Sequence, residues 1–89
     1  MAMSVRTRAL FRRYGFKFDH LGGNVTGFVR DLRNGKTIII QSAGSEGCAP
    51  ERLSEEVCAY WIGTQHSEPL REVCGTIPRV LRAAGRRRS

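Results

Sequence analysis

Residues 34–41 read Asn-Gly-Lys-Thr-Ile-Ile-Ile-Gln and carry the clearest structural signal in this 89-residue chain. The pair Asn34-Gly35 favours a type I′ turn, because both central residues of that turn need positive φ, which asparagine and glycine tolerate. The run Ile38-Ile39-Ile40 is too apolar for a strand that faces water at the edge of a sheet. We therefore expect a hairpin turn at Asn34-Gly35 and a central strand over residues 36–41.

The residues before this turn predict two more strands and a helix. Residues 16–21 alternate with a period of two, and the glycine-rich residues 22–24 predict a hairpin into a second strand over residues 25–32. Further toward the N-terminus, residues 4–14 predict a short helix that begins at an N-cap serine and ends at Gly15. This half of the chain is expected to be a helix followed by a β-meander.

The residues after the central strand predict a loop and then helices. Small polar residues at 42–48 indicate the loop. Residues 50–62 predict the principal helix, because Leu53, Val57 and Trp61 recur at helical spacing while the glutamates lie outside this stripe. A short helix is expected over residues 67–74, and a last one begins after the N-cap Thr76.

Together these elements predict a single α+β domain over residues 1–85 with a basic tail at residues 86–89. The expected order is α-β-β-β-α, with a three-stranded antiparallel sheet packed against the C-terminal helices. A chain of 89 residues is long enough for one core and too short for two.

Charge is the strongest compositional signal, with a net charge of +7 and basic residues gathered at both ends of the chain. Such clusters attract phosphate-bearing partners, and a cationic face would form if the two ends meet in the fold. Residues 46–72 are acidic by contrast, which favours a protein partner instead. The predicted nucleic-acid contacts are Arg6, Arg8, Arg12, Arg13, Lys17, Arg86, Arg87 and Arg88. The aromatic residues Phe16, Phe18, Phe28, Tyr60 and Trp61 are expected in the core rather than as platforms for bases.

The cysteines argue against both a disulfide framework and a metal site. Cys48, Cys58 and Cys74 are odd in number and contain no close ligand pair, so we expect free thiols, a reducing cytoplasmic setting, no bound metal and no cofactor. Cys58 and Cys74 are interpreted as small buried hydrophobes. No apolar run is long enough for a membrane helix or a signal peptide.

Catalysis has little support in the sequence. Asp19 and His20 are the one local acid and base pair, but neighbouring residues on a strand point to opposite faces. His66 lies in a polar stretch and is free to titrate there. The glycine-rich segments at residues 22–23 and 44–47 both lack the pattern of a phosphate-binding loop. We therefore expect a binding protein rather than an enzyme.

The expected order of helix, three strands and helix resembles the double-stranded-RNA-binding domain. Gly15-Phe16, residues 36–40 and residues 75–85 are similar to local strings of HicA toxins, small ribonucleases built on that fold. The resemblance implies an RNA-facing fold. Where the family has Gly-Ser-His with a catalytic histidine, this chain has Gly22-Gly23-Asn24, so neither His20 nor His66 is carried over as catalytic.

The first functional hypothesis is a small non-catalytic module that binds nucleic acid, RNA rather than DNA by the analogy of fold. The second is an interaction protein, of the kind that phages or mobile elements encode to inhibit a host protein complex, comparable to an anti-CRISPR or an antitoxin. It would use the acidic helix or an exposed strand edge. The third is a HicA-like ribonuclease, which would require His20 or His66 for cleavage.

Overall fold

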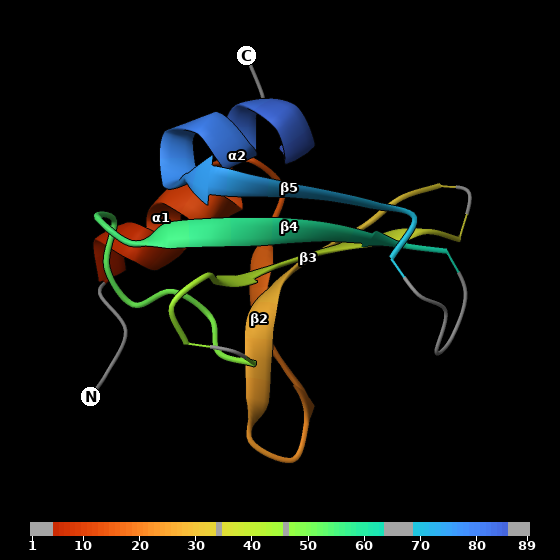
Figure 1. The fold of residues 1–89 in the computed structure, drawn as a ribbon, viewed down its shortest axis with the longest axis horizontal. Helices are drawn as coiled ribbons and strands as arrows, with labels where there is room; N and C mark the ends of the chain where they lie inside the picture. The colour runs from red at the N-terminus through yellow and green to blue at the C-terminus, as the bar shows by residue number, and fades with distance from the viewer. Residues whose placement is uncertain (1–4, 34, 46, 64–68, 86–89) are drawn as a thin grey trace.

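The chain folds as an α+β domain in which five antiparallel strands form one sheet between two helices in sequence (Figure 1). The computed structural model describes residues 5–33, 35–45, 47–63 and 69–85. Each strand pairs with its neighbour in sequence, in the order β1-β2-β3-β4-β5. The elements are α1 (Val5–Arg13), β1 (Lys17–Gly22), β2 (Val25–Asp31), β3 (Thr37–Ser42), β4 (Glu56–Ile62), β5 (Arg71–Thr76) and α2 (Ile77–Ala84).

The expected three-stranded sheet is wrong, because the second half of the chain adds two strands to it. The predicted helix over residues 50–62 is a loop followed by β4, and residues 71–74 of the predicted helix over residues 67–74 lie in β5. β4 runs Val-Cys-Ala-Tyr-Trp-Ile from residue 57 to residue 62, and β-branched and aromatic side chains of this kind fit a strand better than a helix. A short apolar run fits the helical period of 3.6 residues and the strand period of two equally well. Here the segment is a strand because it pairs with β3.

One face of the sheet carries the core. Phe28, Ile40 and Ala59 are register partners on β2, β3 and β4, and all three are buried. Both helices pack on this face, α1 through Phe11 and α2 through Ile77, Val80, Leu81 and Ala84 (Figure 1). β3 is central, as expected.

The end of α1 is set by local chemistry, and the expected stop at Gly15 is confirmed. Gly15 has a φ of +89°, a left-handed conformation that costs glycine little. Its N–H donates to the Arg12 carbonyl at 3.0 Å, and the Phe16 N–H donates to the Phe11 carbonyl at 3.0 Å. These two bonds form a Schellman motif, which turns the chain directly from α1 into β1. The expected N-cap, Ser4, lies outside the described residues.

The start of α2 also follows the sequence prediction. The Thr76 side chain accepts a hydrogen bond from the Arg79 N–H at 3.4 Å, and a proline stands in the first turn. The chain reverses before β2 and before β3 near the glycines that predicted it, with positive φ at Gly22, Gly23 and Gly35. The expected type I′ turn is not confirmed: the Gly35 N–H donates to the Leu32 carbonyl at 3.3 Å, so Gly35 closes the turn, and Asn34 lies outside the described residues. Neither helix in the described part of the chain is long and apolar enough to cross a membrane.

The cysteine prediction is wrong for two of the three residues. Cys58 on β4 and Cys74 on β5 are direct register partners with Cα atoms 4.0 Å apart, and they form a disulfide. Cys48 is an exposed free thiol. An odd cysteine count says nothing about which residues pair, and the two partners are 16 residues apart in sequence. A cytoplasmic location stays a prediction.

Candidate nucleic-acid interface

α1 presents its arginines to solvent because its buried side is narrow. Thr7 and Phe11, four residues apart, are the buried residues of the helix. The Phe11 ring stacks on Phe28 with centroids 4.0 Å apart, and Thr7 Oγ1 donates to the Glu51 carbonyl at 3.0 Å. These contacts fix the rotation of α1 about its axis. The exposed arginines of the helix are Arg6, Arg8, Arg12 and Arg13.

An open cleft of about 800 Å³ lies where α1 turns into β1 and passes the end of β2. One acid, Asp31, lines it together with four basic residues. Asp31 accepts a hydrogen bond from Thr37 Oγ1 at 3.2 Å, so part of its carboxylate is already engaged. The residues lining the cleft are Leu10, Arg12, Arg13, Tyr14, Gly15, Phe16, Lys17, Val29, Arg30 and Asp31.

Arg30, which lines the cleft, also bonds to the end of α2. Its Nη1 donates to the Ala84 carbonyl, the last residue of α2, at 2.8 Å. This bond places a guanidinium at the negative end of the α2 dipole, which is a favourable position for a cation. A guanidinium has five N–H donors, so this bond leaves others that can meet an anion.

A smaller recess of about 120 Å³ adjoins the same helix and contains a partly exposed aromatic ring. The Arg8 guanidinium lies 4.6 Å from the centroid of the Phe18 ring, within cation–π distance. The His20 ring meets Phe18 edge-on at 5.3 Å. The recess is lined by Arg8, Arg12, Phe16, Lys17, Phe18 and Phe28.

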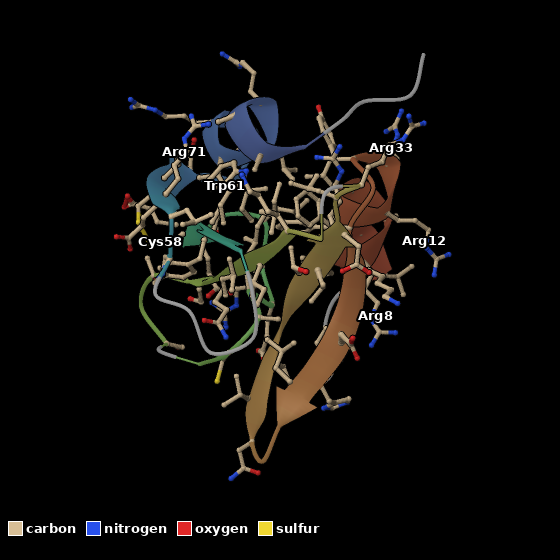
Figure 2. The ribbon with its side chains drawn as sticks, turned by 90° about the vertical axis from the view of Figure 1, so that its right-hand side faces the viewer. Arg8, Arg12, Arg33, Cys58, Trp61 and Arg71 are labelled. Carbon is tan, nitrogen blue, oxygen red and sulfur yellow. A yellow bond between two sulfur atoms is a disulfide. The ribbon has the colours of Figure 1, made fainter. Side chains whose placement is uncertain are left out.

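The structure brings most of the described predicted contacts together on α1 and the start of β1. Arg12 and Lys17 line both hollows, Arg13 lines the cleft and Arg8 lines the recess. Arg6 is exposed on the first turn of α1 and lines neither hollow. In Figure 2 Arg8 and Arg12 project outward from α1, on the opposite side of the view from Cys58 and Arg71.

The predicted contacts Arg86, Arg87 and Arg88 lie outside the described residues, as does His66. Gly85, the residue before that tail, is placed against the end of α1. A Cβ atom added to Gly85 would lie 2.7 Å from Tyr14 Cβ, which leaves no room for a side chain. Tyr14 also lines the cleft, so the described chain ends beside it.

Two residues of this surface were missed by the sequence reasoning. Arg30 belongs to the middle of a strand, where it was not distinguished from an ordinary solvent-facing residue. Its position two residues after Phe28 places it on the helix-covered face, and that alternation was the available signal. Phe18, expected in the core, is only half-buried and contacts Arg8.

The acidic residues of the middle segment lie mainly elsewhere. Glu55 and Glu56 line a separate hollow beside Ser42 at the start of β4, and Glu72 is on β5. The expected acidic helix does not exist, since β4 and a loop occupy its residues. Asp19 Oδ1 accepts a hydrogen bond from the His20 backbone N–H, which is a local contact and does not orient the imidazole.

Comparison with known proteins gave no match to any family model, curated protein or solved structure.

Proposed function

We propose that the chain is a nucleic-acid-binding module and that the cleft between α1, β1 and β2 holds the phosphate backbone. The observation that carries this proposal is the convergence of Arg12, Arg13 and Lys17, from two different elements, on one cleft that also contains Arg30. Phosphate contacts from such side chains supply most of the affinity of basic proteins for nucleic acid. The net charge of +7 adds long-range attraction.

A single-stranded nucleic acid is the ligand that the neighbouring recess favours. Unpaired bases stack on aromatic rings and on arginine planes, and the recess contains a half-buried Phe18 ring with the exposed Arg8 guanidinium over it, 4.6 Å from the ring centroid. A duplex keeps its base faces covered and could use only the phosphate contacts. The five-stranded sheet removes the likeness to a three-stranded RNA-binding fold, and stacking on Phe18 favours a single strand without distinguishing RNA from DNA. RNA stays part of the proposal, and comparison of the labelled RNA and DNA strands decides it.

The test is a salt titration of binding by fluorescence anisotropy, with labelled single-stranded RNA, single-stranded DNA and duplex RNA of one sequence. Changing Arg12 and Arg13 together to Ala is expected to weaken binding to every strand and to lower the slope of log K against log salt by about 1.4 for single strands. Phe18→Leu is expected to weaken single-stranded binding alone.

The matched control removes the same charge from other surfaces. Arg71 lies on β5, on the opposite side of the view in Figure 2 from Arg8 and Arg12, and Arg79 lies on α2; neither lines the cleft or the recess. Changing both to Ala should leave the slope much closer to that of the wild type. A binding constant that does not change with salt concentration, or an equal loss of affinity in the two double variants, would refute the cleft as the phosphate site.

A protein partner is the second candidate, and apolar side chains on the sheet face opposite the helices favour it. Val29, Ile39 and Tyr60 are register partners on the face opposite the helices. They form an apolar row between Lys17 and Glu72 on the two edge strands, in which Ile39 and Tyr60 are half-buried and Val29 is buried beside the cleft. Affinity capture before and after nuclease treatment separates the candidates: a protein that stays bound once RNA and DNA are destroyed supports this second role.

A further inference from the structure

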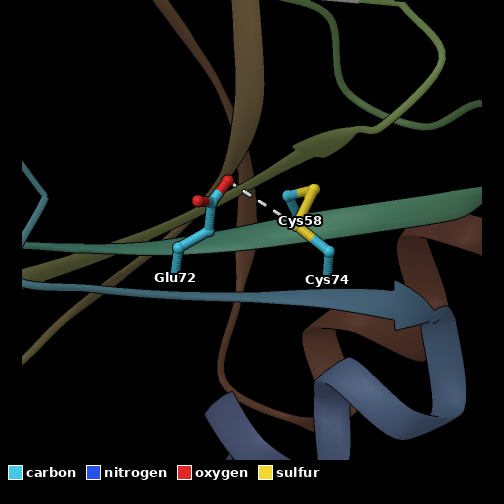
Figure 3. A group of neighbouring side chains, drawn as sticks. All are labelled: Cys58, Glu72 and Cys74. Carbon is cyan, nitrogen blue, oxygen red and sulfur yellow. Dashed lines mark hydrogen bonds between the residues drawn. A yellow bond between two sulfur atoms is a disulfide. The ribbon is translucent and has the colours of Figure 1, made fainter.

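A second group of reactive side chains lies on β4 and β5, away from the basic cleft. Cys58 and Cys74 face each other across the two strands, and Glu72 is two residues before Cys74, on the same face of β5 (Figure 3). Glu72 Oε2 lies 3.6 Å from Cys74 Sγ. A disulfide sulfur carries no proton, so this contact brings a carboxylate against the sulfur without a hydrogen bond while the disulfide is intact.

The three side chains form a ligand set for a borderline-soft metal ion. Their two sulfur atoms and one carboxylate oxygen all lie within 4.8 Å of one another. Tetrahedral zinc binds thiolate sulfur at about 2.3 Å, which places two sulfur ligands about 3.8 Å apart. Rotation of the cysteine side chains after reduction could reach that separation without a change in the strand register.

We propose that the dithiol form of Cys58 and Cys74, with the Glu72 carboxylate, binds Zn²⁺. Three protein ligands leave the fourth tetrahedral position to water, as in an exchangeable site rather than a closed structural one. Because the same two sulfur atoms form the disulfide, oxidation and metal binding exclude each other. The site is therefore a metal site that exists only in the reduced protein.

The reduction that opens the site uses a small-molecule thiol. Two equivalents of the thiol supply two electrons and two protons, the Cys58–Cys74 bond breaks into two thiols, and the reductant leaves as its own disulfide. Zinc then replaces the thiol protons, so its affinity rises with pH. Cys74 is exposed on an edge strand and Cys58 is 8% exposed, so a thiol and a metal ion reach the pair from solvent through Cys74.

The close spacing that sequence reasoning requires of zinc ligands is absent here because the ligands come from two paired strands. Cys58 and Cys74 are 16 residues apart, and only the register of β4 and β5 makes them neighbours. A search for closely spaced cysteines in the sequence therefore does not find a metal site of this kind.

The test is a titration of the reduced and then desalted full chain with Co²⁺ and Zn²⁺ under anaerobic conditions. Reduced wild type is expected to bind one ion per chain and to show a thiolate-to-cobalt charge-transfer band that Zn²⁺ displaces. The oxidised chain should show no band. Cys74→Ser should lose it, and Glu72→Gln should weaken Zn²⁺ binding by at least about 10-fold.

Cys48→Ser is the matched control, since Cys48 is the third cysteine and lies in the loop before β4. It should bind metal as the wild type does. Loss of the band in Cys48→Ser, equal binding by the oxidised and reduced chains, or full affinity in Glu72→Gln would each overturn the proposed ligand set. Circular dichroism of reduced wild type with and without Zn²⁺ checks that the chain stays folded, and an absent band in a folded reduced chain would refute the site.

Discussion

At the scale of single residues, Glu55 shows how one carboxylate orders a loop. Its Oε1 accepts a hydrogen bond from Ser42 Oγ at 2.7 Å, and its Oε2 accepts from the backbone N–H groups of Glu51 at 2.7 Å and Arg52 at 2.9 Å. Partial burial acts to raise the pKa of Glu55, but the hydrogen bonds from Ser42 and the two N–H groups, aided by the Arg52 charge, outweigh it and lower that pKa. Glu55 thus favours the loop when ionised.

We expect Glu55→Gln to lower the free energy of unfolding at neutral pH by about 1–3 kcal/mol, because hydrogen bonds to a charged acceptor are lost. A lowered folded-state pKa stabilises the protein fully above the ordinary value of 4.5 and is lost as the pH falls through the folded value. The difference between variant and wild type should therefore shrink below pH 4.5. Urea denaturation at neutral and acidic pH measures it.

The control for this prediction is Glu56→Gln, the exposed neighbour at the start of β4. It removes the same charge and leaves the loop carboxylate in place. Equal unfolding free energies for the two variants at neutral pH would show that the Glu55 hydrogen bonds do not stabilise the loop.

At the scale of elements, the contact between the ends of α1 and α2 shapes the basic cleft. Arg30 on β2 donates a hydrogen bond to the carbonyl of Ala84, the last residue of α2. The next residue, Gly85, packs against Tyr14. A Cβ on Gly85 would lie 2.7 Å from both Tyr14 and the Leu81 carbonyl oxygen. The absence of a side chain at Gly85 is therefore what lets the two helices approach here.

Gly85→Ala is expected to destabilise the protein by about 1–3 kcal/mol through overcrowding and to weaken RNA binding by moving Tyr14 at the cleft. Thermal unfolding and anisotropy measure the two effects. Gly44→Ala is the matched control, because a Cβ at Gly44 meets nothing within 4 Å. If both substitutions have equal effects, the close approach at Gly85 does not hold the helices together.

At the scale of the whole molecule, the disulfide ties β5 to the rest of the sheet. β5 is an edge strand with β4 as its partner, and four of its six residues are exposed. Val73 nevertheless packs against the core, and α2 follows β5 without a break. The link between Cys58 and Cys74 thus secures the strand that carries α2.

Reduction of the disulfide is expected to lower stability by about 3 kcal/mol, the chain-entropy value for a loop of about this length. For a domain of this size that corresponds to a fall of roughly 12–24 °C in melting temperature. Thermal unfolding of Cys48→Ser with and without reductant measures it and avoids exchange with the third thiol. An unchanged melting temperature would show that β5 is held by its hydrogen bonds and packing alone.

The features that local chemistry determines were predictable from the sequence alone. The helix stop at Gly15, the chain reversals near the glycines and the Thr76 cap depend on residues within a few positions of one another, and the structure has them where the pattern placed them. The basic character of α1 was equally visible, because charge is read directly from composition.

Tertiary structure decided what depends on partners distant in sequence. Residues 56–62 match a helical spacing in the sequence, but they form β4 in the structure. Pairing with β3 and β5 supplies hydrogen bonds for the backbone of β4 and places its side chains alternately on the two faces of the sheet. The same pairing joined Cys58 to Cys74, and the packing of α1 beside β2 brought Arg30 to Arg12 and Lys17. A single sequence shows which residues are present, but strand register and helix packing set the distances between them, since these depend on the burial of the whole core.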